Sequence, residues 1–161
     1  MKTGSRESAS KKASWTGPLY LDASALVKIY MPEPGSAELD DALIGRDDLI
    51  ISDLAITEVT SAMARRRRQG EVSPEELMRL HRAVLADVEA GVFRNVELLP
   101  QVYREAERML ISLESAALRA ADSLHVALAI AAKVASIVTF DQRLAAAAER
   151  MGIHAVPQSI E

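Results

Sequence analysis

The stretch LYLDASALVKIY, residues 19–30, predicts a short strand that passes directly into a helix. Residues 19–21 form an apolar run, and residues 23–31 have the composition and spacing of a helix. Asp22 lies between them, at the point where the strand is expected to run into a core. Because an unpaired carboxylate is costly to bury, this position requires a partner for its charge.

The same alternation of apolar strand and helix continues along the chain. Further strands are expected within residues 48–53, 92–100, 136–140 and, as a short final strand, 153–157. Helices are expected over residues 36–44, 54–69, 73–91, 102–113, 119–133 and 141–152. This order predicts an α/β fold with three layers, in which a central parallel sheet of four to five strands is flanked by helices.

Length and composition indicate a single domain. The chain has 161 residues, of which 49% are hydrophobic, which is enough for one core. Residues 18–161 are expected to form this domain, and residues 1–17 a disordered basic tail that lacks the apolar segment of a signal peptide. No apolar run approaches the roughly 18 residues of a membrane span. The absence of cysteine excludes disulfides and thiolate zinc sites and fits a cytoplasmic protein.

Positive charge is concentrated at one place in a chain whose formal net charge is −4. The cluster consists of Arg65, Arg66, Arg67 and Arg68, at the end of a predicted helix. Cations are favoured at a helix C-terminus, so a solvated helix end explains the cluster. A patch that contacts RNA phosphates or a protein partner explains it equally well.

Four acids occupy positions that are unusual for charged residues. Asp22 and Asp141 each follow a predicted strand and open a helix, where the simplest interpretation is an N-cap. Glu58 has Leu54 and Ala62 on its own helix face, so it is either part of a site or an edge residue that reaches water. Asp122 lies in the predicted helix with the most apolar surroundings, where it must be paired, cap the helix or bind a cation.

These acids predict a metal site. In parallel α/β sheets, ligands bind at the carboxyl ends of the strands, and Asp22 and Asp141 follow two such ends. Several carboxylates held close together repel one another unless a cation lies between them. Ligation by oxygen alone favours Mg²⁺ or Mn²⁺, which activate water and polarise phosphoryl oxygens.

Four stretches carry a resemblance to a known family. LYLDASALVKIY, SDLAITEVTSAMARR, AADSLHVALAIA and IVTFDQRL occur in this order and together resemble the acidic signatures of PIN-domain ribonucleases. The group they most resemble is the VapC toxins of bacterial toxin–antitoxin pairs. The similarity extends from about residue 19 to residue 157, so the three-layer fold is expected to be PIN-like.

The resemblance implies roles for individual residues. Asp22 and Asp122 would be the principal ligands of Mg²⁺ or Mn²⁺, and Glu58 would complete the set directly or through water. Asp141 would be the fourth acid and support a second metal. Ser24 and Thr139 would be supporting hydroxyls, although ordinary hydrogen bonding at a helix start and a strand end explains them equally well.

The resemblance also implies partners and an activity. The protein would be a metal-dependent endoribonuclease that hydrolyses RNA phosphodiester bonds, and would form a homodimer that a VapB-like antitoxin neutralises.

His125 and His81 lie on apolar helix faces, and the simplest interpretation of both is a packed core residue.

Other functions remain to be weighed against the nuclease. A catalytically silent PIN-like scaffold that binds RNA or a protein partner would have lost some of the acids, and all four are present. A phosphoryl-accepting receiver domain requires a lysine after a late strand, where this chain has Asp141. A dehalogenase-type phosphatase requires a second acid two residues after Asp22, where this chain has Ser24.

Overall fold

The centre of the fold is a five-stranded sheet whose paired strands are all parallel. The computed structural model describes residue 15 and residues 17–113 and 118–158. The strands are β1 (Leu19–Leu21), β2 (Leu49–Ser52), β3 (Arg94–Val96), β4 (Ser136–Val138) and β5 (His154–Val156). Their order across the sheet is β3-β2-β1-β4-β5, with β1 in the middle. The predicted parallel α/β fold is therefore confirmed, with the upper of the predicted strand numbers.

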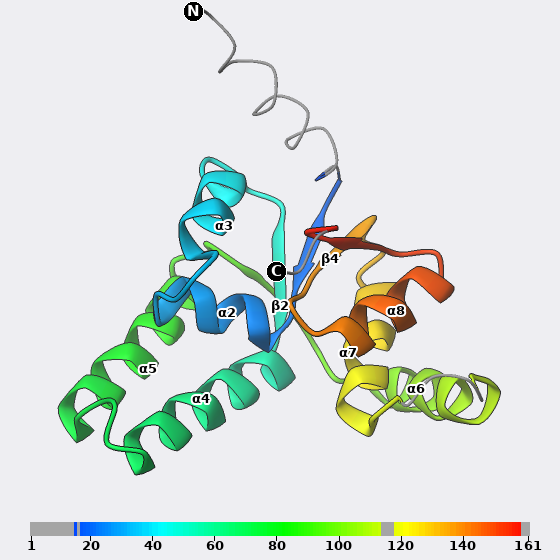
Figure 1. Cartoon of the computed structure of the whole chain (residues 1–161). Coiled ribbons are helices and arrows are strands. Elements are labelled where there is room, and N and C mark those ends of the chain that lie inside the picture. Colours follow the sequence, from blue (N-terminus) through cyan, green and yellow to red (C-terminus); the bar gives the residue numbers. More distant parts are fainter. Residues whose placement is uncertain (1–14, 16, 114–117, 159–161) are drawn as a thin grey trace, which may run out of the picture.

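Helices cover both faces of this sheet, as Figure 1 shows. One face carries α2 (Ala23–Tyr30), α3 (Ser36–Leu43), α4 (Asp53–Arg68) and α5 (Pro74–Glu89). The other face carries α6 (Pro100–Ser112), α7 (Ala120–Ala131) and α8 (Gln142–Arg150). The three predicted layers are present, with one hydrophobic cluster on each side of the sheet.

The central strand contributes to both clusters because its side chains alternate between the two faces. Leu19 and Leu21 pack against the layer of α2 to α5, whereas Tyr20 points into the layer of α6 to α8. All three are fully buried. Buried on both faces, such a strand reads as an unbroken apolar run, which is what the sequence has at this point.

Element boundaries differ from the sequence expectations mainly at β3. A strand was expected within residues 92–100, but only Arg94–Val96 is a strand, and Pro100 is already the first residue of α6. β3 is an edge strand that pairs with β2 alone, and proline is well placed in the first turn of a helix. The predicted tail, residues 1–17, lies almost entirely outside the described residues. None of the described helices is long and apolar enough to cross a membrane.

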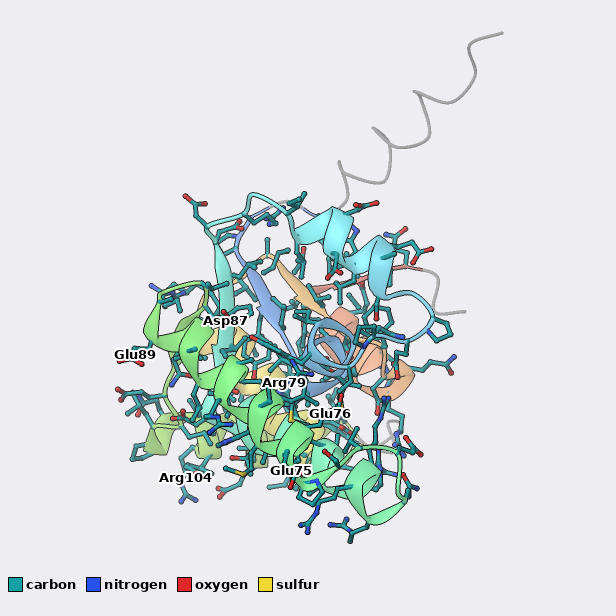
Figure 2. The ribbon with its side chains drawn as sticks, turned by 90° about the vertical axis from the view of Figure 1, so that its left-hand side faces the viewer. Glu75, Glu76, Arg79, Asp87, Glu89 and Arg104 are labelled. Carbon is teal, nitrogen blue, oxygen red and sulfur yellow. The ribbon has the colours of Figure 1, made fainter. Side chains whose placement is uncertain are left out.

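Helix α5 is amphipathic and closes one side of the molecule. Figure 2 shows its charged side chains, among them Glu75, Glu76 and Arg79, on the outer surface. Leu80 and Val84 are buried on the opposite side of the helix. The outward charges and inward apolar side chains place α5 at the surface of this layer, with one face on the core.

A serine cap begins α5, and its removal provides a stability test. The Ser73 hydroxyl oxygen accepts a hydrogen bond from the Glu76 backbone N–H at 3.1 Å. Ser73→Ala leaves this N–H without its cap and is expected to lower the free energy of unfolding by about 1 kcal/mol. Urea denaturation measures the change. Ser61→Ala, at an exposed position within α4, is the matched control and should change the stability much less.

Candidate active site

The candidate site begins at the carboxyl ends of β1 and β4. The strand order reverses at this point, since the chain proceeds from β1 to β2 on one side and later from β4 to β5 on the other. Asp22 directly follows β1, and Thr139 directly follows β4. A crevice outside the carboxyl ends of the strands at such a reversal is the usual ligand position in open α/β sheets.

Asp22 is the most deeply placed of the four acids, with 3% of its surface exposed. Its Oδ1 accepts hydrogen bonds from the Ser24 hydroxyl at 2.6 Å and from the Ala25 backbone N–H at 3.0 Å. Its Oδ2 accepts a hydrogen bond from the Thr139 hydroxyl at 2.6 Å. Burial raises the pKa of Asp22, an effect that His125 and these hydrogen bonds partly offset. The predicted helix cap is present, and no lysine or arginine among the described residues forms an ion pair with the buried carboxylate.

The two hydroxyls that contact Asp22 also fix the loop after β4. The Ser24 oxygen accepts the Phe140 backbone N–H at 2.7 Å, and the Thr139 oxygen accepts the Asp141 backbone N–H at 3.0 Å. Each hydroxyl therefore donates to Asp22 and accepts from the loop. This arrangement attaches the loop that carries Asp141 to the end of β1, more than a hundred residues away in the sequence.

Asp141 caps α8, as the sequence predicted, and is more open than Asp22. Its Oδ1 accepts backbone N–H groups of Arg143 at 2.8 Å and Leu144 at 3.3 Å. Its Oδ2 lies 3.8 Å from the Arg143 guanidinium. With 37% of its side chain exposed, Asp141 can reach a ligand without moving the fold.

Asp122 lies in the first turn of α7 and is 8% exposed. Its Oδ2 accepts the backbone N–H of Arg119 at 3.1 Å, so the helix-start interpretation is correct as far as this oxygen is concerned. Arg119 thus contacts Asp122 through its backbone. The other oxygen, Oδ1, accepts no hydrogen bond from the described residues.

Glu58 is held at one end of a chain of polar side chains that the sequence did not reveal. Glu58 Oε2 lies 2.6 Å from His125 Nε2, His125 Nδ1 lies 2.8 Å from the Tyr20 hydroxyl, and that hydroxyl lies 2.7 Å from Ser52 Oγ. Ser52 also caps α4 by accepting the Ala55 backbone N–H. These hydrogen bonds connect two helices, α4 and α7, with two neighbouring strands, β1 and β2.

The proton positions along this chain follow from its geometry. If the neutral His125 ring carried its proton on Nδ1, a bare Nε2 lone pair would face the Glu58 carboxylate at 2.6 Å, which is repulsive. His125 Nε2 therefore carries a proton and donates it to Glu58. In the neutral ring, Ser52 donates to Tyr20 and Tyr20 donates to His125 Nδ1, so every member is satisfied. No buried side-chain polar atom among the described residues lacks a partner.

His125 and Tyr20 are therefore site residues that sequence reasoning missed. His125 was interpreted as a packed core residue, and it is buried, with 3% exposed, but both of its nitrogens are hydrogen-bonded. Glu58, with 35% of its side chain exposed, reaches water as the alternative interpretation required and also contacts His125. The one sequence signal was the spacing of His125 three residues after Asp122, which places them on one side of α7.

The four acids fit a hard cation by the chemistry of their donors. Each acid has an oxygen lone pair that is available to a cation. In the described part of the chain, no hydrogen bond is donated to Glu58 Oε1, Asp122 Oδ1 or Asp141 Oδ2. Asp22 Oδ2 accepts one hydrogen bond, from Thr139, and keeps a second lone pair. Hard divalent cations prefer such oxygens. Among the described residues, however, no three Asp, Glu, His or Cys side chains are grouped closely enough to hold a metal ion. Metal binding by this set stays a prediction.

The arginine cluster occupies the last turn of α4, two turns beyond Glu58. Arg66 is paired with Glu33, at 2.6 Å, and lies 3.9 Å from Glu71. Arg65, Arg67 and Arg68 are exposed. The cluster therefore does not act as one unit, because one of its four cations is already neutralised.

Comparison with known proteins identifies the family. The model of the PIN domain matches residues 19–150. Ribonuclease VapC45 and ribonuclease VapC49, from two strains of Mycobacterium tuberculosis, are each 32% identical to this chain over 145 residues, which cover 89% of the chain and 97% of each relative.

Solved structures agree on the fold. The structure of Mycobacterium tuberculosis VapC20, described as a toxin that cleaves the sarcin-ricin loop, aligns with a TM-score of 0.65 at 15% identity and covers 80% of this chain and 94% of its own. FitAcB from Neisseria gonorrhoeae aligns with a TM-score of 0.65 at 17% identity, over 85% and 95% of the two chains. At these identities the likeness concerns the fold alone. The matched domain and the near full-length similarity to the two ribonucleases show that this chain belongs to the PIN-domain family, among the VapC-like ribonucleases.

Proposed function

We propose that this protein is a metal-dependent endoribonuclease that hydrolyses RNA phosphodiester bonds in the cytoplasm, as the toxin of a toxin–antitoxin pair. The observation that carries the metal dependence is Asp22. This carboxylate is buried at the reversal point of the sheet, its pKa is raised by burial, and in the part of the chain that the structure describes no lysine or arginine pairs with it. A bound divalent cation would compensate its charge.

Four acids are proposed as the catalytic and ligand set. Asp22 and Asp122 would hold Mg²⁺ or Mn²⁺ through the carboxylate oxygens that the fold leaves available. Glu58 would complete the set, and Asp141 would be the fourth acid at the rim. When bound, such a cation polarises phosphoryl oxygens and activates water.

The remaining polar groups of the site position these acids. Ser24 and Thr139 donate to both oxygens of Asp22 and so fix the orientation of its carboxylate. His125 donates to Glu58 Oε2 and leaves Oε1 to face the crevice. In the hydrolysis, water attacks the phosphorus, a carboxylate of the set accepts the proton of the water, and the bond to the ribose oxygen breaks as that oxygen takes up a proton from solvent.

Partners follow from the relatives' names and the family. We propose an RNA substrate, a VapB-like antitoxin that neutralises the activity, and a homodimer. Exposed apolar side chains on α6, namely Tyr103, Leu110 and Ile111, support an association between copies.

The test is cleavage of mixed ribosomal and transfer RNA by the purified protein. Cleavage is expected with Mg²⁺ or Mn²⁺, is expected to stop with EDTA, and should return when the metal is added in excess. Asp122→Asn is the control for a contaminating nuclease, because its amide oxygen can still accept the Arg119 N–H while the anionic ligand is gone.

Two results would contradict the proposal in different ways. Cleavage that persists in Asp122→Asn would place the activity elsewhere or in a contaminant. A protein that cleaves no RNA and whose melting temperature does not respond to Mg²⁺ or Mn²⁺ would instead favour the scaffold that binds RNA or a protein partner without cleaving.

A further inference from the structure

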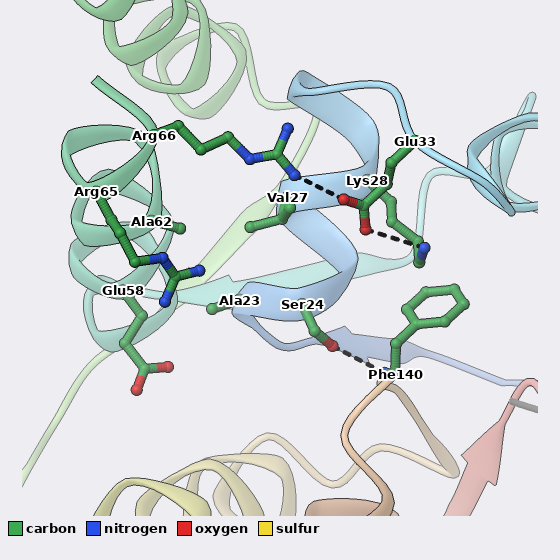
Figure 3. Close-up of a pocket in the computed structure, with 10 residues that line it drawn as sticks. All are labelled: Ala23, Ser24, Val27, Lys28, Glu33, Glu58, Ala62, Arg65, Arg66 and Phe140. Atoms are coloured by element: carbon green, nitrogen blue, oxygen red, sulfur yellow. Dashed lines mark hydrogen bonds and ion pairs between the residues drawn. The ribbon is translucent and has the colours of Figure 1, made fainter. Parts of the chain in front are cut away.

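A cleft of about 460 Å³ lies beside the acids, between α2 and α4. Figure 3 shows Glu58 and Arg65 on the α4 side, Ser24 and Lys28 on the α2 side, and Phe140 below. Glu58 and Ser24 belong both to this cleft and to the candidate active site. The cleft therefore continues the site along the surface.

The charge of the cleft is positive although the neighbouring site is acidic. Its lining contains the cations Lys28, Arg65 and Arg66 and the anions Glu33 and Glu58. Lys28 and Arg66 share Glu33, at 3.0 and 2.6 Å. Partial burial raises the pKa of Glu33, but the hydrogen bonds and charges of Lys28 and Arg66 outweigh this effect and hold the pKa below its usual value. Glu33 is therefore an ionised partner of both cations. Arg65 is the cation that the cleft leaves uncompensated.

The Arg65 side chain forms no hydrogen bond or ion pair with any described residue. Glu58, Ala62 and Arg65 are spaced by four and three residues and line the same face of α4. In Figure 3 the guanidinium extends from α4 toward α2, the Glu58 carboxylate points toward the bottom of the view, and no ion pair joins the two side chains. The guanidinium therefore presents its donors to whatever occupies the cleft and does not neutralise the catalytic acid.

The position of Arg65 matches an anion next to the reacting group. Seven residues separate Glu58 from Arg65, which is about 10 Å along the helix axis. An anion at Arg65 is therefore a different one from the phosphate at the acids. Guanidinium groups bind phosphate through two parallel hydrogen bonds.

We propose that Arg65 forms a subsite for a non-scissile phosphate of the RNA, in the cleft between α2 and α4. This inference rests on the proposed ribonuclease function, because the RNA strand must be held at the acids for a neighbouring phosphate to reach the cleft. An acidic peptide segment is the competing occupant. RNA is favoured because the cleft opens into the acids, which repel a carboxylate chain and accept a phosphodiester only with their cation.

The arginine cluster supplies a matched control. Arg67 is exposed, its side chain has no hydrogen-bond or ion-pair partner among the described residues, and it is not part of the cleft lining. It follows Arg65 by two residues, which places it on nearly the opposite side of α4. Arg65→Gln and Arg67→Gln remove the same charge from the same helix turn, so only a located phosphate contact distinguishes them.

The experiment measures binding of a labelled single-stranded RNA of 12 random nucleotides to the Asp122→Asn protein, at one fixed Mg²⁺ concentration and over a series of KCl concentrations. Adding Arg65→Gln should weaken binding about tenfold. It should also make the slope of log K against log[salt] shallower by about 0.7, the value for one phosphate contact on a single strand. Arg67→Gln should change neither by a comparable amount. Arg65→Lys should restore most of the slope and only part of the affinity.

Cleavage and a peptide competitor complete the design. In the otherwise unsubstituted protein, Arg65→Gln should raise KM for RNA with little change in kcat. Equal affinities and slopes for the Arg65→Gln and Arg67→Gln proteins would overturn the subsite while leaving the nuclease intact. Absence of both RNA binding and cleavage in every variant would overturn the nuclease together with the subsite. Binding of a ten-residue poly-glutamate peptide that depends on Arg65, without an effect on RNA, would reassign the cleft to an acidic partner.

Discussion

Asp22→Asn is expected to lower RNA cleavage by at least about a hundredfold while leaving the protein at least as stable as the unsubstituted chain. The loss of activity follows because the amide replaces an anionic oxygen at the centre of the proposed ligand set. The amide oxygen keeps the cap, since asparagine serves as well as aspartate at this position, whereas the amide nitrogen cannot accept the Thr139 hydroxyl, and this one lost hydrogen bond is smaller than the cost of the buried charge.

The expected stability follows from the raised pKa of Asp22. Because its folded pKa lies above the unfolded value, the folded protein binds this proton more strongly than the unfolded chain does. Stability from this group is therefore present at low pH and is lost as the pH rises through the folded pKa. At neutral pH without metal, the ionised carboxylate opposes folding, and Asp22→Asn removes that cost.

Thermal melts with and without Mn²⁺ distinguish the two effects. The unsubstituted protein should gain melting temperature with Mn²⁺, whereas the Asp22→Asn protein should start at an equal or higher temperature and gain little. A variant that melts much lower than the unsubstituted chain without metal would show that the charge of Asp22 stabilises the fold by itself. A variant that keeps full cleavage would remove Asp22 from the ligand set.

His125→Ala is expected to lower both stability and activity. The substitution leaves the Tyr20 hydroxyl and the Glu58 carboxylate without a hydrogen-bond partner and opens a cavity beside buried Val126 and Ala129. An unsatisfied buried polar group costs about 1–3 kcal/mol, and the cavity adds to this, so urea denaturation should report a loss of about 2–4 kcal/mol.

The effect of His125→Ala on cleavage is expected to pass through Glu58. Freed from His125, the carboxylate adopts other rotamers, and cleavage should fall about tenfold or more. In a Glu58→Gln background, already low in activity, adding His125→Ala should cause little further loss, because residues that act as a unit are not additive. Two independent, multiplicative losses would contradict the positioning role. Tyr20→Phe, one step further along the chain, should reduce activity less than His125→Ala.

The parts of the site that the sequence predicts are those fixed by local rules. Asp22 and Asp141 cap their helices through backbone N–H groups two or three residues away, and Ser73 does the same for α5. Such contacts depend on nearest neighbours in the chain. The apolar runs of β1 and β4 are equally local signals, because a strand that is buried on both faces has a continuous apolar sequence that can be recognised from its own residues.

The contacts that sequence reasoning could not supply join distant segments. His125 and Glu58 are 67 residues apart, and Tyr20 and His125 are 105 residues apart. The sequence pattern of α7 does not indicate that its one histidine, His125, faces α4. His125 was therefore interpreted as a packed core residue, which is the usual role of a histidine on an apolar helix face. The division of the arginine cluster is of the same kind, since Arg66 is neutralised by Glu33, 33 residues earlier.

The place of β1 in the middle of the sheet has a consequence for biosynthesis. Its neighbour on one side, β4, and the Thr139 hydroxyl that orients Asp22 are made more than a hundred residues after β1. A nascent chain that ends before residue 139 carries the first acid but lacks both that hydroxyl and Asp141. Domains fold as units during synthesis only once their elements are available. The order of translation therefore delays assembly of the site until Thr139 and Asp141 have left the ribosome.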